Sequence, residues 1–260
     1  MKMFLNIFGA KIPMYGLMIV LGIATANLLA YLVLKKRKMD FNDFVIIEAF
    51  GAGMGFLGAK LMFLWASREW IDWSRFFEHD YFESVMRGGF VFYGGVLLGV
   101  PSAIWFGRIN RIKTLDYMKQ IIFILPWAHA FGRIGCFCSG CCYGVPYDGP
   151  IAVTFPEGCA APPGISLFPV QLVEAGCLLV IAVILFFMQM KLHSEFTIEA
   201  YLILYAIVRF VLENYRYDAI RGHMGVLSTS QWISILMLAA GVVSITIRLV
   251  RKKKCVPAEN

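Results

Sequence analysis

Long apolar stretches separated by short polar segments make up most of this chain. A helix needs about 20 mostly apolar residues to cross the hydrocarbon core of a bilayer. Seven stretches approach or exceed that length, at residues 12–34, 44–66, 89–107, 116–135, 169–190, 199–215 and 229–250. Hydrophobic residues form 59% of the sequence, too large a share for a soluble domain. The pattern predicts an all-α integral membrane protein with seven transmembrane helices.

The basic residues predict an orientation for these helices. They gather after the first, third, fifth and seventh stretches, at residues 35–38, 108–113, 191 and 251–254. With seven crossings these four segments share one side of the membrane, and an excess of Lys and Arg marks the cytoplasmic side. We therefore expect the N-terminus outside and the C-terminus in the cytoplasm. This placement also explains the net charge of +7 without a nucleic-acid partner.

No composition shift divides the chain, so we expect one membrane domain over residues 1–260, with two longer loops outside. The first loop, about 67–88, mixes tryptophans with charged residues, as is typical of a segment that lies along lipid headgroups. The second loop, about 136–168, is rich in Gly, Pro and Cys. We expect it to form an ordered cap over a cavity.

The spacing of Gly53, Gly55 and Gly58 fits the dinucleotide fingerprint GxGxxG. That fingerprint needs a preceding strand and a βαβ unit, whereas these glycines lie inside a predicted membrane helix. Gly51 and Gly55 also form a GxxxG pair, and small residues let membrane helices approach closely. We interpret these glycines as a helix-packing surface.

Four of the seven cysteines lie close together, at Cys136, Cys138, Cys141 and Cys142. Thiolate clusters bind zinc and iron–sulfur centres, so a metal site is one interpretation. The spacing matches no standard motif and no histidine follows at ligand distance, which favours packed or disulfide-bonded cysteines. We expect no metal and no cofactor.

Two arginines, Arg133 and Arg209, lie within predicted membrane helices. A charge near the bilayer centre costs roughly 2.5–3.5 kcal/mol, so such residues usually face a partner, a cavity or an anion. On a helix His129 shares a face with Arg133, and Arg209 shares one with Glu213 and Arg216. Both faces lie near the outer ends of their helices and predict a shared polar pocket. Its natural ligand in a bilayer is a lipid phosphate, whereas snorkelling side chains and one helical ion pair are the alternative.

Several motifs together resemble the family of bacterial prolipoprotein diacylglyceryl transferases. The chain reads Gly132-Arg133-Ile-Gly135-Cys136-Phe137 and then Gly140-Cys-Cys-Tyr-Gly144, where the family signature is approximately Gly-Arg-x-Gly-Asn-Phe-x-Asn-x-Glu-x-x-Gly. The further matches, in chain order, are Tyr15-Gly16, Gly58-Ala-Lys60-Leu, Gly88-Gly89-Phe-x-Phe-Tyr93-Gly94-Gly95 and Arg209-Phe-Val-x-Glu213-x-x-Arg216. The resemblance therefore covers most of the chain.

The resemblance implies transfer of the diacylglyceryl group of phosphatidylglycerol to the lipobox cysteine of a prolipoprotein, with release of glycerol phosphate. It implies four catalytic residues: Tyr93, Arg133, Arg209 and Glu213. It also implies that phosphatidylglycerol is bound by Arg133, Arg209, Tyr15, Lys60, Arg216, His129 and Gly144. The expected partners are phosphatidylglycerol, the signal-peptide segment of a prolipoprotein and membrane lipid.

The chain departs from the family pattern at four positions: Lys60 replaces a common Arg, Tyr93 a common His, Cys136 an Asn and Cys141 a Glu. The base that takes the thiol proton could therefore be Tyr93, His129 or Glu213, and its position favours Tyr93. We expect none of the cysteines to be the nucleophile, because the attacking thiol belongs to the substrate.

Three other functions stay open at this point. The first is a phosphatidylglycerol-dependent transferase with a different acceptor. The second is a non-enzymatic lipid or anion transporter, which should show repeats or broken helices, and no repeat is evident. The third is a redox membrane protein that uses the cysteine cluster. We expect a monomer in the bacterial cytoplasmic membrane, with its active site facing the outer leaflet.

Overall fold

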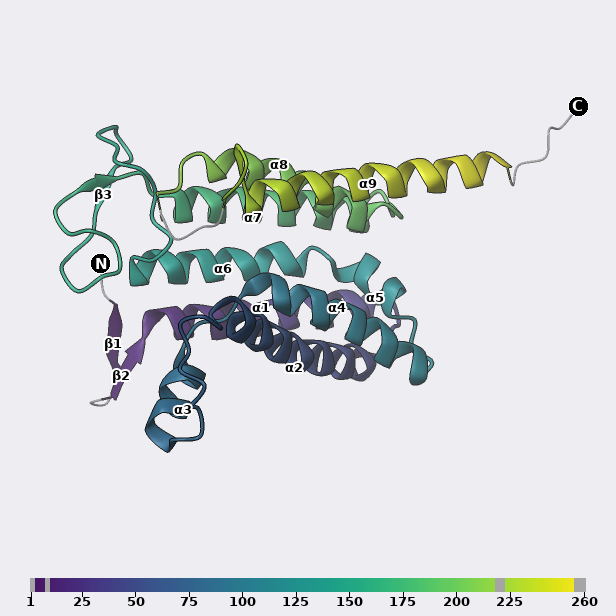
Figure 1. Cartoon of the computed structure of the whole chain (residues 1–260). Coiled ribbons are helices and arrows are strands. Elements are labelled where there is room, and N and C mark those ends of the chain that lie inside the picture. The colour runs from purple at the N-terminus through teal and green to yellow at the C-terminus, as the bar shows by residue number, and fades with distance from the viewer. Residues whose placement is uncertain (1–2, 8–9, 218–222, 255–260) are drawn as a thin grey trace, which may run out of the picture. The chain divides into compact units, whose positions relative to one another are not determined.

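The chain folds mainly into helices, as the computed structural model shows for residues 3–7, 10–217 and 223–254 (Figure 1). Five helices in this described part are long and apolar enough to cross a membrane, or six if one bent pair forms a single span. The prediction of an all-helical membrane protein is therefore confirmed. Seven crossings with the N-terminus outside stay a prediction, and so does a single domain over residues 1–260.

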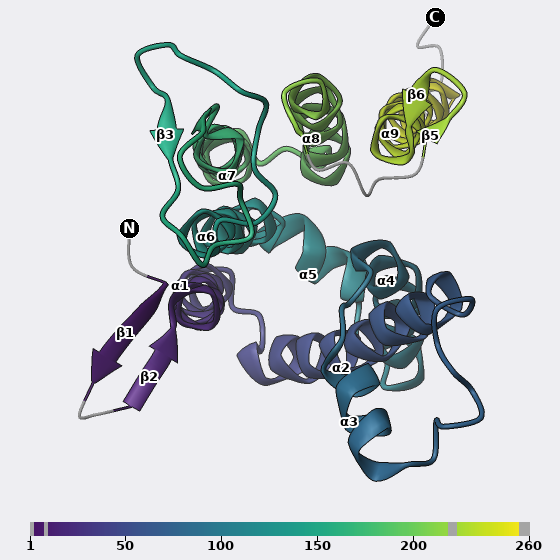
Figure 2. The same cartoon turned by 60° about the vertical axis from the view of Figure 1, so that its left-hand side comes forward.

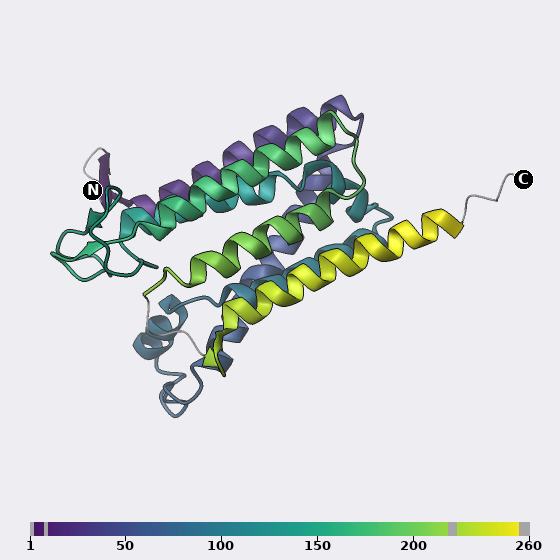
Figure 3. The same cartoon turned by 90° about the horizontal axis from the view of Figure 1, so that it is seen from above.

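The chain divides into two compact units, of which the first combines residues 1–33 with 119–260. Its main helices are α1 (Met14–Lys36), α6 (Ile124–Ser139), α7 (Val170–Met190), α8 (Thr197–Glu213) and α9 (Thr229–Lys254). In this unit α6 lies between α1 and α7, and α8 lies between α7 and α9 (Figures 2 and 3). The helices that carry the predicted phosphate site, α6 and α8, are thus both next to α7.

The fourth predicted membrane stretch is not one straight helix. It consists of α5 (Thr114–Ile121) and α6, whose axes differ by 61°. Pro126 lies in the first turn of α6 and has no N–H to donate to the carbonyl of Ile122, so one hydrogen bond of the helical ladder is missing next to the break. The sixth predicted stretch, α8, has 17 residues and is too short to count as a candidate crossing here.

The second unit, residues 34–118, is built on two closely packed helices, α2 (Phe41–Ala66) and α4 (Phe92–Ile109). The helices touch backbone to backbone at their glycines. A Cβ added to Gly58 would meet the carbonyl oxygen of Gly94 and lie 2.6 Å from Cβ of Leu98. Gly51, Gly55 and Gly58 of α2 therefore form a helix-packing surface, as the sequence predicts, whereas Gly53 faces no neighbour within 4 Å.

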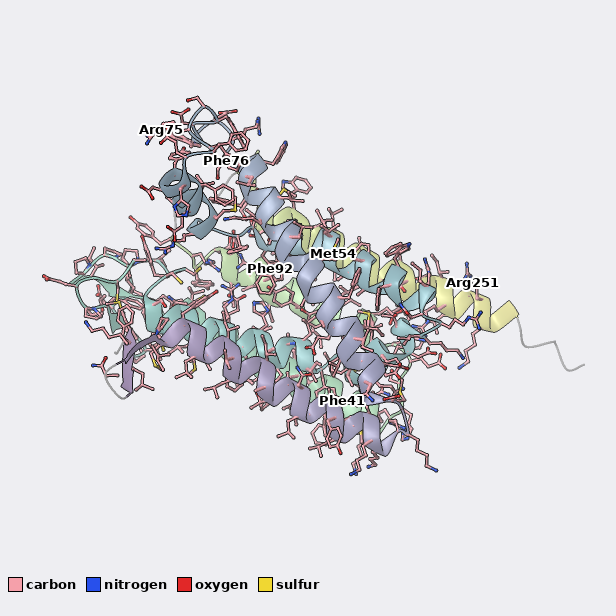
Figure 4. The ribbon with its side chains drawn as sticks, turned by 90° about the horizontal axis from the view of Figure 1, so that it is seen from below. Phe41, Met54, Arg75, Phe76, Phe92 and Arg251 are labelled. Atoms are coloured by element: carbon pink, nitrogen blue, oxygen red, sulfur yellow. The ribbon has the colours of Figure 1, made fainter. Side chains whose placement is uncertain are left out.

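The loop between α2 and α4 carries a short helix, α3 (His79–Arg87). Arg75 and Phe76 of this loop lie beyond the end of α2 that is opposite Phe41 (Figure 4). Its aromatic side chains point outward, with Trp70 88% and Phe77 93% exposed. Exposed aromatics beside charges agree with a segment that rests on lipid headgroups.

In the described part of the chain, three short antiparallel hairpins accompany the helices; they are too short to be recognised in the sequence. They pair β1 (Phe4–Ile7) with β2 (Ala10–Pro13), β3 (Val153–Thr154) with β4 (Ser166–Leu167), and β5 (His223–Met224) with β6 (Leu227–Ser228). The second hairpin belongs to the loop between α6 and α7. Phe155, Ala161 and Leu167 form a small apolar core in that loop, so it is an ordered segment, as expected for a cap.

Candidate functional site

A buried glutamate on α7 joins two of the predicted phosphate-binding arginines. Nη2 of Arg133 lies 3.1 Å from Oε1 of Glu174, and Nη1 of Arg216 lies 3.9 Å from Oε2 of the same carboxylate. The side chains of Glu174 and Arg216 are only 1% and 2% exposed. Glu174 therefore holds α6 and the chain segment after α8 around one buried cluster of charges.

The pattern of α7 explains how this carboxylate is positioned. Gln171 and Glu174 are three residues apart, so they lie on one face of the helix, and both are buried. Nε2 of Gln171 donates to the backbone carbonyl of Cys141 at 2.8 Å. The polar face of α7 thus holds both Arg133 on α6 and the start of the loop that follows α6.

The second predicted arginine has its own buried partners on α8 and α9. Nη2 of Arg209 lies 2.7 Å from Oε2 of Glu213, one turn later on α8, and donates to Oγ of Ser230 at 3.0 Å. Oγ of Ser228 donates to Oε1 of Glu213 at 2.8 Å. Side chains of α8, β6 and α9 therefore form a network that orients this guanidinium and its carboxylate.

His129 connects the two charged clusters. It lies on α6 close enough to both Arg133 and Arg209 for both charges to act on it, and its ring is 5.4 Å from that of Tyr205. Among the described residues, Nε of Arg133 and Nη1 of Arg209 have no hydrogen-bond acceptor. The sequence prediction of two arginine faces in one polar region agrees with this geometry, and both arginines keep a donor for a further acceptor.

Gly144 brings the signature loop next to the end of α8. It pairs with Arg216 in an isolated antiparallel bridge, and N–H of Val145 donates to the carbonyl of Tyr215 at 3.0 Å. A Cβ on Gly144 would meet the carbonyl of Phe168 and lie 2.8 Å from that of Tyr215. A larger residue at position 144 would therefore push apart the backbone segments that hold Arg216.

Tyr15 lies at the start of α1, beside the last turns of α6. A Cβ on Gly135 would be 3.1 Å from Cδ2 of Tyr15, so this glycine permits the close contact. The phenol is also close enough to Arg133, Cys136 and Cys141 for electrostatic interaction. Tyr15 therefore adjoins the charged cluster, and its role in lipid binding stays a prediction.

The turn after α6 folds the cysteine-rich sequence back on itself. α6 ends at Gly140, which has a left-handed φ of 66°, and Cys142 also has a positive φ of 57°. A left-handed conformation costs a residue other than glycine roughly 1–2 kcal/mol, so the surroundings must hold Cys142 in place. The Sγ atoms of Cys136, Cys141 and Cys142 all lie within 4.8 Å of one another.

These thiols share the environment of the arginines. Hydrogen bonds from the thiols of Cys136 and Cys141 lower the pKa of the Cys142 thiol, and the charges of Arg216 and Arg133 lower it further. Cys136 stands where the family signature has Asn, and Cys141 stands where it has Glu. This corner of the site is therefore where the chain departs most from the family pattern.

Two predicted site residues belong to the second unit. Nζ of Lys60 donates to the carbonyls of Val85 and Gly88, at 3.0 and 3.2 Å, and lies over the ring of Phe63. Tyr93 is in the first turn of α4, where its ring contacts Phe92. In this unit Lys60 thus fastens the loop before α4, and roles for Lys60 and Tyr93 in lipid binding and proton transfer stay predictions.

Sequence reasoning missed the residues that orient the arginines, namely Glu174, Gln171, Ser228 and Ser230. Glu174 could have been identified from the sequence, because it is an acidic residue inside an apolar stretch. Like the arginines, it needs a partner there. The serines carried none, since hydroxyl side chains are frequent at helix starts for local reasons.

The helices and their buried arginines define a multi-helix membrane protein with a buried cluster of paired charges. The chain matches the family model described as prolipoprotein diacylglyceryl transferase over residues 2–247. It therefore belongs to the prolipoprotein diacylglyceryl transferase family.

Individual members of the family align with nearly the full chain. A protein of Clostridium tetani named phosphatidylglycerol--prolipoprotein diacylglyceryl transferase is 32% identical over 95% of this chain and 98% of its own length. A protein of Clostridium perfringens with the same name, numbered 2, is 32% identical over 96% of both chains. A Finegoldia magna protein of that name is 28% identical over 92% of both chains.

Proposed function

We propose that this chain transfers the diacylglyceryl group of phosphatidylglycerol to the lipobox cysteine thiol of a prolipoprotein, with release of glycerol phosphate. The observation that carries this proposal is the pair of buried arginines, Arg133 and Arg209, which flank His129 and keep donors for a further acceptor. Family membership and the names of the aligned relatives supply the reaction. The site would face the outer leaflet of the bacterial cytoplasmic membrane.

The chemistry explains why two arginines are needed. The acceptor thiol loses its proton, its sulfur forms a bond to the glyceryl carbon, and the C–O bond to phosphate breaks with its electron pair left on oxygen. Charge therefore develops on the leaving glycerol phosphate. Guanidinium groups held in a dry site stabilise such charge with forked hydrogen bonds that a point charge cannot match.

Supporting residues around the arginines have distinct proposed roles. Arg216 and Glu174 keep Arg133 oriented, and Glu213 does the same for Arg209. Tyr15, His129 and Gly144 shape the phosphate pocket, and Lys60 contributes to phosphatidylglycerol binding. Tyr93 is the proposed proton acceptor, since Glu213 is already engaged by Arg209 and Ser228.

The direct test uses purified protein, phosphatidylglycerol labelled in its headgroup, and a lipobox peptide. We expect released glycerol phosphate and a peptide that gains one diacylglyceryl group through a thioether. A peptide with Ser in place of the lipobox Cys is the matched control and should give neither product. Absence of both products with the Cys peptide, in protein that binds the lipid, would overturn the proposed acceptor.

A second candidate function is transfer from phosphatidylglycerol to an acceptor other than a prolipoprotein. The residues Tyr93, Cys136 and Cys141 favour it, because there the chain departs from the family pattern while the arginines keep to it. Headgroup release that depends on an added small thiol or alcohol, but not on the lipobox peptide, would select this alternative.

A further inference from the structure

The three thiols of Cys136, Cys141 and Cys142 form a cluster that the proposed phosphate chemistry does not use. Their Sγ atoms lie within 4.8 Å of one another. Sulfurs around a tetrahedral zinc ion, at Zn–S distances near 2.3 Å, are about 3.8 Å apart. Rotations of the thiol side chains therefore suffice to bring all three within ligand distance of one ion.

The backbone around this cluster is held in place on several sides. Cys136 belongs to the last turn of α6, and its carbonyl accepts a hydrogen bond from N–H of Cys141 at 3.1 Å. The side chain of Gln171 holds the carbonyl of Cys141, and Cys142 keeps a left-handed backbone. Most contacts that fix the turn involve the backbone; the thiol of Cys141 also donates to the carbonyl of Cys136 at 3.6 Å, and a bound ion would replace this hydrogen bond.

We propose that Cys136, Cys141 and Cys142 bind a zinc ion as three thiolates, with the fourth coordination position open to the acceptor thiol. Three thiolates outweigh the charge of one divalent cation, so the nearby Arg133 and Arg216 stabilise the loaded site and do not repel it. Soft thiolate ligands select zinc or monovalent copper over magnesium or calcium. Zinc sites with three protein ligands and an open position are typical of catalytic centres.

The open position supplies what the proposed reaction needs, and in this respect the inference rests on the proposed function. Zinc would lower the pKa of a bound acceptor thiol, which eases transfer of its proton to the base proposed above. The sulfur of this thiol then forms the bond to the glyceryl carbon while the C–O bond breaks and the electron pair leaves with glycerol phosphate. A bound thiolate would compensate for the Asn and Glu that this chain lacks at Cys136 and Cys141.

Zinc content is the first test, measured by elemental analysis of protein purified in detergent without added metal and again after chelation and reloading. We expect stoichiometric zinc in the wild-type protein. Cys136→Ser and Cys142→Ser should weaken zinc binding by at least the roughly 10- to 100-fold that loss of an outer-shell partner causes. Cys138→Ser, two residues away on the same helix and outside the cluster, is the matched control and should keep zinc.

The role of the open position is tested on wild-type protein loaded with cobalt. Addition of the lipobox peptide should raise the thiolate-to-cobalt charge-transfer absorption, and the Ser peptide should not. An unchanged spectrum with the Cys peptide would overturn the acceptor-binding part and leave a structural ion. This readout needs no turnover, so it separates failure of the zinc site from failure of the proposed transferase reaction.

Two results would overturn the proposal as a whole. One is zinc-free wild-type protein that still transfers diacylglyceryl at full rate after chelation. The other is a disulfide between two of the three cysteines, detected by alkylation and mass spectrometry of unreduced protein. Variants that lose zinc must elute as monodisperse protein of wild-type helicity, which shows that they are folded. Chelation and reloading of the wild-type protein test the role of zinc without any substitution.

Discussion

At the scale of single residues, the site depends on arginines whose charges are balanced by buried carboxylates. Arg133 is paired with Glu174, and Arg209 with Glu213. Taking one partner from a buried pair leaves the other charge uncompensated, which costs more than the pair itself contributes. A substitution that keeps the positive charge of an arginine is therefore expected to change mainly the rate, whereas loss of a glutamate charge is expected to lower stability.

Arg133→Lys should lower the rate of glycerol phosphate release by about 30- to 1,000-fold, the range expected when one charged hydrogen bond to the leaving group is lost. An ammonium cannot reproduce the fork of a guanidinium. Arg108→Lys is the control, because Arg108 is exposed at the end of α4 and should tolerate the change. Equal rates for both variants at equal expression would make Arg133 a structural residue.

Glu174→Gln should destabilise the protein by about 3–5 kcal/mol, because Arg133 and Arg216 lose the carboxylate that balances them. The measurement is thermal unfolding in detergent, monitored as the loss of monodisperse protein with rising temperature. Glu78→Gln removes a carboxylate from an exposed pair with Arg75, 3.0 Å apart, and should leave the unfolding temperature nearly unchanged. Similar shifts for the two variants would contradict the bridging role of Glu174.

At the scale of elements, the second unit is built on the packing of α2 against α4. Gly58 faces the backbone of Gly94 with no room for a side chain, whereas a Cβ on Gly53 of the same helix would meet nothing within 4 Å. Membrane helices gain stability from such close packing, because lipid supplies no hydrophobic drive to bring them together. The two glycines therefore make a matched pair for testing this interface.

Gly58→Ala should destabilise the protein by about 1–3 kcal/mol, since the added methyl group forces the helix backbones apart. Gly53→Ala should be neutral or slightly stabilising, because alanine has the higher helix propensity. Thermal unfolding of both variants in one detergent separates steric from propensity effects. A larger loss for Gly53→Ala than for Gly58→Ala would refute the contact.

At the scale of the whole molecule, the prediction is seven membrane crossings with the N-terminus outside. A cysteine introduced at Ser74 should react with a membrane-impermeant maleimide in intact cells, and one at Lys36 only after permeabilisation. Mass spectrometry of the peptide that contains each position distinguishes it from the native cysteines. Labelling of position 36 in intact cells would refute seven crossings with the N-terminus outside.

The sequence predicts the membrane helices well because apolar length is a direct physical requirement of the bilayer. It also identifies Arg133 and Arg209 as candidate site residues, since a charge inside such a helix needs a partner. It does not predict the bend before α6, because a proline near a helix start is compatible with an unbroken helix as well. Nor does it predict that Glu174 joins Arg133 to Arg216, because that contact depends on how three distant segments pack.

The burial of the arginines has a consequence for salinity. Mobile ions screen exposed charges over about 8 Å at physiological ionic strength, but they hardly enter a buried cluster. The side chains of Arg133 and Arg209 are 15% and 7% exposed, respectively. The KM for phosphatidylglycerol should therefore stay nearly constant when salt rises several-fold, as vesicle assays can measure. The rate of lipid modification should then depend little on the salt concentration around the cell.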